Sequence, residues 1–234
     1  MLKKLFFGVV SWIPPYSIIP LIVGFLFNTL IYKGVMPIAE NWYHHDFTTD
    51  FDRLVPIIPE FVIIYLGCYI FWIINYILIA KQGKEHFYRF WVADFTSRIV
   101  CLVFYLALPT TNIRPELAGT GICEALLNWV WSIDPAVNLF PSIHCLVSWF
   151  CYIGIRGQEQ VPKWYRAFSC IFAILVCLST QFTKQHYVID IVGGVALAEL
   201  TYLLGRKTNL YKGVQNFFER MNQKYGLVKE RVAE

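Results

Sequence analysis

Residues 181–200 read QFTKQHYVIDIVGGVALAEL. An apolar run begins at about 185 and continues to about 205, which is long enough to cross a bilayer as a helix. Three polar residues, Lys184, His186 and Asp190, stand at its start. His186 and Asp190 are four residues apart, so they share one face of a helix. The stretch predicts a membrane-spanning helix that begins with side chains capable of chemistry.

Five more apolar runs occur in this chain of 234 residues. All six runs cover about 8–32, 54–79, 91–110, 140–156, 162–183 and 185–205. Charged residues make up only 15% of the chain, whereas soluble domains contain about a quarter. The sequence therefore predicts an all-α polytopic membrane protein with six transmembrane helices. We expect residues 1–205 to form the helical domain and residues 206–234 a basic cytoplasmic tail near anionic headgroups.

The basic residues divide unequally between the two sets of loops. One set of loops holds only four basic residues. Lys33 follows the first run and Arg53 directly precedes the second, while Arg114 follows the third run and Lys184 the fifth. Fifteen other Lys and Arg residues lie in the terminal segments and in the loops after the second and fourth runs. Because basic loops favour the cytoplasm, both termini are expected there. The net charge of +4 then reflects an inner membrane surface and does not indicate nucleic-acid binding.

Three polar clusters fall on the non-cytoplasmic side in this topology. They contain Arg114 after the third run, Ser142 and His144 at the start of the fourth, and Lys184, His186 and Asp190 at the start of the sixth. The free N–H groups at a helix N-terminus favour an anion, and a guanidinium can bind a phosphate. Two histidines and a carboxylate supply a nucleophile, a proton donor and an orienting group. The set predicts phosphoryl transfer with no metal and no cofactor.

These motifs resemble, in order and kind, the three signature motifs of the type 2 phosphatidate phosphatase superfamily over roughly residues 95–195. The resemblance implies that His186 is the nucleophile forming a phosphohistidine, Asp190 its partner and His144 the general acid. It implies that Arg114 and Ser142 bind phosphate. The expected function is an integral-membrane lipid-phosphate phosphatase, placed in the plasma membrane with its active site on the non-cytoplasmic face.

Three positions depart from the pattern of that superfamily. Ala107 and Thr180 stand where it has a lysine and an arginine, and Ile143 stands where it has a glycine. Two phosphate-binding cations are therefore missing, and Lys184 is the nearby basic residue that could replace one. The stretch STQFTKQHYVIDIVGG is similar to the inositol-phosphorylceramide and sphingomyelin synthase branch. Headgroup transfer to a lipid or polyol alcohol is thus an alternative to hydrolysis, and a non-catalytic lipid-binding role is a third hypothesis. The sequence determines neither the lipid nor the oligomeric state.

Other polar residues inside the runs have a structural interpretation. Asp94 and Arg98 are four residues apart in the third run and are expected to form a buried ion pair. Glu199 lies in the same cytoplasmic half and is expected near that pair. Gly193 and Gly194 are expected to permit close helix packing.

Overall fold

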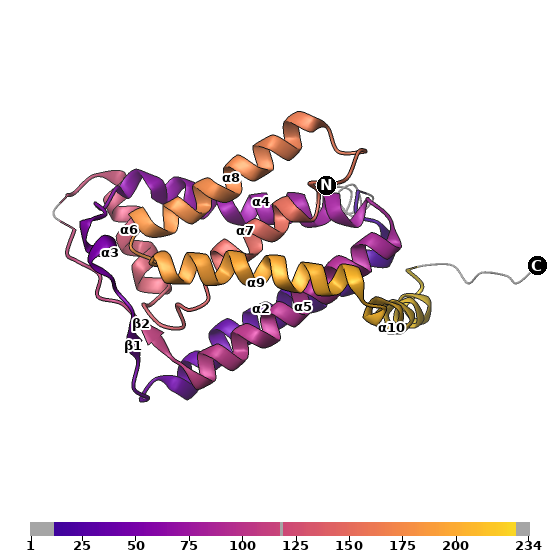
Figure 1. Cartoon of the computed structure of the whole chain (residues 1–234), viewed down its shortest axis with the longest axis horizontal. Helices are drawn as coiled ribbons and strands as arrows, with labels where there is room; N and C mark the ends of the chain where they lie inside the picture. Colours follow the sequence, from indigo (N-terminus) through magenta and orange to yellow (C-terminus); the bar gives the residue numbers. More distant parts are fainter. Residues whose placement is uncertain (1–11, 118, 228–234) are drawn as a thin grey trace, which may run out of the picture.

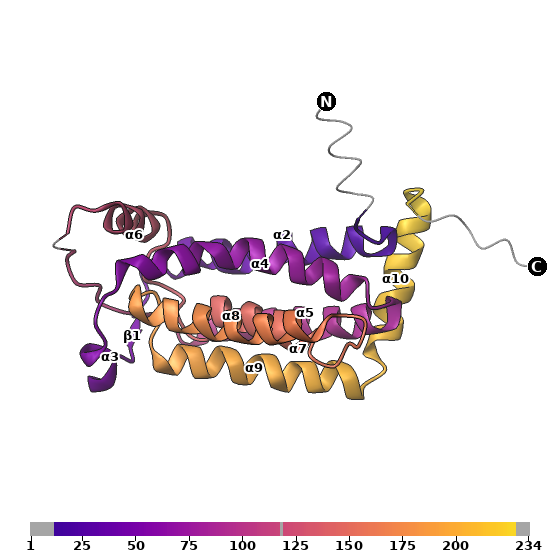
Figure 2. The same cartoon turned by 90° about the horizontal axis from the view of Figure 1, so that it is seen from above.

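The computed structural model describes residues 12–117 and 119–227 as a bundle of long helices (Figure 1). The bundle helices are α2 (Ile18–Ala39), α4 (Val62–Ala80), α5 (Lys84–Ala107), α7 (Ile143–Ile153), α8 (Lys163–Phe182) and α9 (Val188–Lys207). Helix α10 (Leu210–Lys224) crosses one end of the bundle, which we call the α10 end (Figure 2). The opposite end, which we call the loop end, carries the remaining elements: α3 (Asp50–Leu54), α6 (Ile122–Ile133), and the parallel strands β1 (His45–Asp46) and β2 (Thr110–Thr111). Single 3-10 turns, η1 (Pro15–Ser17) and η2 (Pro59–Phe61), precede α2 and α4. The predicted all-α class is confirmed.

Five helices of the described residues are long and apolar enough to cross a membrane. With their leading turns they are Pro15–Ala39, Pro59–Ala80, Lys84–Ala107, Lys163–Phe182 and Val188–Lys207. The predicted fourth span, 140–156, is a helix of 11 residues, which is about 16 Å long and shorter than the ~30 Å hydrocarbon core. This helix, α7, contacts α4, α8 and α9 and is mostly buried. Its apolar sequence therefore serves packing inside the protein.

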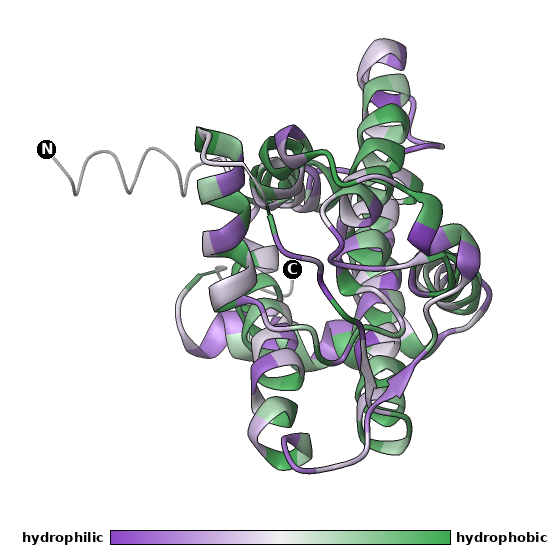
Figure 3. Cartoon of the chain, turned by 90° about the vertical axis from the view of Figure 1, so that its left-hand side faces the viewer, coloured by the Kyte–Doolittle hydropathy of each residue, from purple (hydrophilic) through white to green (hydrophobic). Residues whose placement is uncertain are grey.

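The outer surface of the bundle is apolar. Phe25 on α2, Ile70 on α4, Ile171 on α8 and Leu200 on α9 are each more than half exposed. Viewed from the loop end, hydrophobic residues predominate along the helices (Figure 3). Soluble proteins rarely expose apolar patches of this extent, whereas lipid chains accommodate them. The chain is an integral membrane protein.

The buried centre of the bundle contains the predicted ion pair. Arg98 Nη2 lies 2.8 Å from Asp94 Oδ1, and both side chains are buried. The Tyr76 hydroxyl donates to the same oxygen at 2.9 Å, so the desolvated carboxylate has two donors. The expectation for Glu199 is wrong, because its carboxylate pairs instead with Arg156 at 2.8 Å near the α10 end.

Helix α10, which follows α9, lies against the helical domain, where it contacts α5 and α2. Tyr211 and Phe218 of α10 are buried, and the Arg89 guanidinium of α5 lies 4.0 Å from the centre of the Tyr211 ring. Lys84 Nζ lies 3.0 Å from Glu219 Oε1. Four basic residues used in the charge argument, Lys3, Lys4, Lys229 and Arg231, fall outside the described residues.

Two glycines allow α9 to approach α7 and the loop before it. A Cβ atom on Gly194 would stand 2.6 Å from the Ser142 carbonyl oxygen, and one on Gly193 would stand 2.4 Å from the Phe140 ring. Real Cβ atoms are not found at such distances, so a side chain at either position would force the Ser142 backbone or the Phe140 ring to move. This confirms the expected close packing at Gly193 and Gly194.

We expect Gly194→Ala to destabilise the protein by about 1–3 kcal/mol, because the new methyl group overlaps a backbone oxygen and the helices must separate. The matched control is Gly213→Ala on α10, where a Cβ meets no atom within 4 Å and helix propensity predicts a gain of about 0.5–1 kcal/mol. Thermal unfolding of both variants in detergent micelles checks the prediction. Equal midpoints for Gly194→Ala and the parent chain would contradict the proposed close contact.

Candidate active site

The turn between α8 and α9 places His186 inside the protein. The Thr180 carbonyl at the end of α8 accepts hydrogen bonds from the N–H groups of Gln185 at 2.9 Å and His186 at 3.0 Å. Lys184 adopts a left-handed conformation with φ of 52°, which lets the chain reverse within a few residues. His186 is 6% exposed and stands just before α9.

The second histidine comes from α7. His144 lies in the first turn of this helix, two residues after its N-cap residue Ser142. The ring centres of His144 and His186 are 5.7 Å apart, although the residues come from different helices. Nδ1 of each ring is buried without a hydrogen-bond partner among the described residues. The fold therefore brings together the two imidazoles that the sequence predicted.

Asp190 lies behind His186 at the start of α9. Its Oδ2 atom is 3.6 Å from His186 Nδ1 and also accepts the Tyr187 N–H at 2.9 Å. The Asp190 carbonyl accepts the N–H of Ser142 at 3.1 Å, which ties the start of α9 to the start of α7. The carboxylate can therefore orient the His186 ring, and its own position is set by backbone contacts.

Ser142 and Arg114 each lie next to a residue that adjoins the histidines in the chain. Ser142 caps α7, where its Oγ atom accepts the Cys145 N–H at 3.3 Å. Arg114 donates to the Asp134 carbonyl at 2.8 Å and to Gln185 Oε1 at 2.5 Å, so it lies beside the residue that precedes His186. Burial lowers the pKa of the Arg114 guanidinium, which nevertheless keeps its charge at neutral pH.

Lys184 contacts the loop before α4. Its ammonium group donates to the carbonyl oxygens of Asp52 at 2.7 Å and Val55 at 2.6 Å. Burial lowers the pKa of Lys184, and the charge of Asp52 opposes that shift. The lysine holds the segment after α3 against the turn, and its role as a phosphate ligand stays a prediction.

Comparison with known proteins identifies the family. The family model for the PAP2 superfamily matches residues 39–204, which include all six predicted site residues. The chain belongs to the PAP2 superfamily. This membership confirms the resemblance to type 2 phosphatidate phosphatases that the three motifs indicated.

Two curated relatives of this PAP2 chain carry the same description. Sphingosine-1-phosphate phosphatase 2 of Mus musculus is 28% identical over 159 residues, covering 52% of this chain and 45% of the relative. The protein of that name from Homo sapiens is 25% identical over 156 residues, covering 54% and 39%. The match thus spans less than half the length of either relative. No solved structure gives a significant match.

Asp134 is a carboxylate near the histidine pair that the sequence reasoning missed. It follows α6, and it accepts hydrogen bonds from the hydroxyls of Tyr32 on α2 and Tyr65 on α4, the latter at 2.7 Å. The Tyr65 ring lies 4.6 Å from the His144 ring, centre to centre. Burial favours a higher pKa for Asp134, but the charge of His144 and the two tyrosine hydroxyls outweigh it and leave the pKa below its ordinary value. In the sequence, an aspartate at a helix end gave no sign of these distant partners.

Asp52 is a second carboxylate that the sequence reasoning missed. It is fully buried and joins three segments of the loop end. One oxygen accepts Gln181 Nε2 at 2.8 Å and the Val188 N–H at 2.9 Å, and the other accepts the Thr49 N–H at 2.9 Å. The only sequence signal was local: Thr49 and Asp52 have the spacing of a capping box. Asp52 therefore secures both sides of the turn that carries His186.

We expect Asp52 to stabilise the fold at neutral pH and to lose that effect in acid. Burial favours a higher pKa for Asp52, but hydrogen bonds from Thr49, Val188 and Gln181 prevail and hold its pKa below the ordinary value of 3.8. A lowered folded-state pKa means that the stabilisation is complete above 3.8 and disappears as the pH falls through the lower, folded-state value. Asp52→Asn should cost about 2 kcal/mol at neutral pH.

Unfolding measured between about pH 6 and about pH 2 checks this prediction. The difference between the parent chain and Asp52→Asn should shrink toward the acid end. Asp50→Asn is the matched control, because Asp50 is an exposed carboxylate of the same short helix. A difference that stays constant with pH would contradict the assigned role.

Proposed function

We propose that this PAP2 protein is a lipid-phosphate phosphatase that acts through a phosphohistidine intermediate. The observation that carries the proposal is the pairing of His144 and His186, whose ring centres lie 5.7 Å apart beside Asp190. An imidazole pair with a carboxylate behind one ring supplies a nucleophile and a separate proton donor. The relatives described as sphingosine-1-phosphate phosphatases support a phosphomonoester with a lipid tail as substrate.

The reaction starts with attack by His186 on phosphorus. Since Nδ1 faces Asp190 at 3.6 Å, Nε2 is the nucleophilic atom. An N–P bond forms as the P–O bond to the lipid oxygen breaks, and His144 gives its proton to that leaving oxygen. Water then attacks the phosphohistidine, His144 takes the proton of that water, and inorganic phosphate leaves. Asp190 stabilises the positive charge of the substituted imidazole.

Phosphate binding falls to Arg114, Ser142 and Lys184 in this proposal. Arg114 Nε is buried without a hydrogen-bond partner among the described residues, so one guanidinium donor is free for an anion. Ser142 lies at the N-terminus of α7, where backbone N–H groups and the helix dipole favour negative charge. Lys184 contributes if its ammonium group leaves the carbonyl oxygens of Asp52 and Val55.

Asp134 is proposed to favour the protonated form of His144. Burial lowers the pKa of His144 to about 4, and the negative charge of Asp134 opposes that shift. Tyr65 lies between Asp134 and His144. Its hydroxyl donates to the Asp134 carboxylate, and its ring packs on the His144 ring. Asp134 is thus a positioning residue, because its negative charge changes the pKa of His144 without contact with the substrate.

The loop end is proposed to face the non-cytoplasmic side. The basic residues of the described chain divide between the two ends, with Lys33, Arg53, Arg114 and Lys184 at the loop end and most others at the α10 end. The more basic end is expected in the cytoplasm. The phosphate of a lipid in the non-cytoplasmic leaflet then reaches the histidines, while the tail of that lipid stays beside the exposed apolar helices.

Phosphate release from sphingosine-1-phosphate in detergent micelles tests the proposal, with the purified full chain and EDTA present. We expect inorganic phosphate to form without an acceptor alcohol. A product that forms only when a lipid or polyol alcohol is added would replace hydrolysis by transfer. Absence of turnover with sphingosine-1-phosphate, phosphatidate and an isoprenyl phosphate would overturn the enzymatic proposal altogether.

A further inference from the structure

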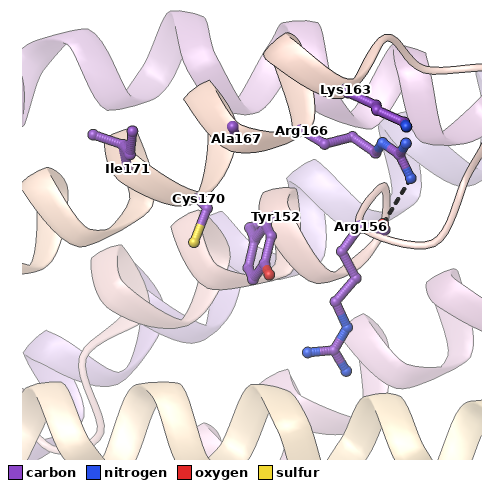
Figure 4. Close-up of a pocket in the computed structure, with 7 residues that line it drawn as sticks. All are labelled: Tyr152, Arg156, Lys163, Arg166, Ala167, Cys170 and Ile171. Atoms are coloured by element: carbon purple, nitrogen blue, oxygen red, sulfur yellow. Dashed lines mark hydrogen bonds between the residues drawn. The ribbon is translucent and has the colours of Figure 1, made fainter.

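A cavity lined by basic and apolar residues lies at the α10 end, away from the histidines. It has a volume of about 430 Å³ and lies between the end of α7 and the first half of α8 (Figure 4). Its lining residues are Tyr152, Arg156, Lys163, Arg166, Ala167, Cys170 and Ile171. Lys163 begins α8 and Thr180, which contacts the His186 turn, is near its end. The rise of an α-helix puts about 25 Å between them, so this cavity is separate from the candidate active site.

The cavity carries uncompensated positive charge. Arg156 is neutralised by Glu199, with its two terminal nitrogens 2.8 and 3.1 Å from the carboxylate oxygens. Arg166 donates to the carbonyl oxygen of Arg156 at 3.1 Å, a contact with a neutral group. The Lys163 ammonium has no hydrogen bond or ion pair within the described residues. Two cations, Lys163 and Arg166, are therefore available to an anion.

The polarity of the cavity changes along α8. The cations lie in the loop before α8 and at the start of that helix. Ala167, Cys170 and Ile171 line the wall further along α8 (Figure 4). Ile171 is 58% exposed on the apolar outer surface of the bundle. Trp164, 70% exposed beside the cations, is a residue type typical of the headgroup level. A ligand that matches this wall has an anionic head and an apolar tail parallel to α8.

We propose that this cavity binds an anionic phospholipid of the leaflet at the α10 end. Its phosphate lies against Lys163 and Arg166, and an acyl chain follows Ile171 along α8. The bound lipid joins α7 to α8, so it stabilises the bundle without taking part in catalysis. A basic pocket between transmembrane helices is a recognised way of holding lipid headgroups. The proposal is independent of the phosphatase reaction, because it uses none of the residues of that site.

Lipid retention by the purified full chain tests the proposal. Native mass spectrometry would count bound lipids after incubation in micelles with phosphatidylglycerol, phosphatidylcholine or inorganic phosphate alone. We expect one phosphatidylglycerol to be retained in preference to phosphatidylcholine, together with a higher unfolding midpoint. Lys163→Gln combined with Arg166→Gln should weaken retention roughly thirtyfold, as expected for two interfacial cations.

The matched control is Lys207→Gln combined with Lys212→Gln, which removes two exposed cations from the same end of the protein. It should retain the lipid as the parent chain does. Equal losses in both double variants would show general attraction to a basic face and would overturn the site. Stabilisation by inorganic phosphate alone, or equal retention of both lipids, would also overturn it. Lys163→Glu, which breaks no contact of the described residues, gives the same test if the double variant fails to fold.

Discussion

Replacing His186 by alanine should lower kcat/KM for a lipid phosphomonoester by about 10⁴-fold or more, because the variant lacks the atom that attacks phosphorus. Asp190 and His144 keep their positions, so substrate binding should change far less than turnover. Rapid-quench experiments with ³²P-labelled substrate should detect acid-labile phosphate on the parent chain and none on His186→Ala. Phosphate release measured over time supplies the rates.

The control for this result is His44→Ala, which removes an imidazole from the same end of the protein. His44 contacts the Trp42 carbonyl through Nδ1 at 2.9 Å and has no contact with the paired histidines. Its activity should stay within a few-fold of the parent chain. Full activity in His186→Ala would exclude the nucleophilic role, and labelled phosphate on that variant would place the intermediate on another residue.

Asp134→Asn should shift the alkaline limb of the pH–rate profile to lower pH by about one unit and reduce activity above it about tenfold. In the proposed reaction His144 must be protonated to donate, and the charge of Asp134 raises the pKa of the His144 ring. Asparagine keeps the shape of the side chain and can still meet the hydroxyls of Tyr32 and Tyr65. Other titratable groups that face His144 are Tyr69, whose hydroxyl lies 3.3 Å from Nε2, Tyr65 and His186, and they are unchanged.

Tyr32→Phe separates the charge of Asp134 from its hydrogen bonds. This variant loses one donor to the carboxylate but keeps the negative charge, so its alkaline limb should stay where the parent chain has it. A substrate with a good leaving group, such as an aryl phosphate, needs less proton donation and should restore much of the Asp134→Asn activity. An unshifted pH–rate profile in Asp134→Asn, or no rescue by the aryl ester, would show that Asp134 has only a structural role.

The sequence predicted which residues lie together in the candidate site because their signals are local. The four-residue spacing predicted that His186 and Asp190 meet on one helix face. Their side chains do lie 3.6 Å apart, but α9 begins at Val188, so His186 reaches Asp190 from the turn that precedes the helix. The place of His144 at the start of an apolar run predicted a helix N-terminus, and α7 begins at Ile143. The same reasoning failed for Glu199. Helical rise placed it at the right depth, but only the rotation of α9 determines that it faces Arg156.

The apolar runs predicted where the helices lie but not whether each helix faces lipid or protein. An apolar segment has the same composition in both environments. Residues 140–156 therefore looked like a span, whereas α7 is an 11-residue helix buried among α4, α8 and α9. Likewise, Lys184 looked like a free cation at a helix start, and its ammonium group is held by the carbonyl oxygens of Asp52 and Val55.

Composition, run length and short-range spacing were thus enough to establish a helical membrane protein, its family motifs and the residues of the histidine pair. These properties depend on near neighbours along the chain and on transfer of apolar surface from water. Two further carboxylates, Asp134 and Asp52, were revealed by the folded chain alone. Asp134 meets Tyr32 and Tyr65 across 102 and 69 residues, and Asp52 meets Gln181 across 129. No local pattern encodes such contacts, because they arise from how the helices pack and where their ends meet.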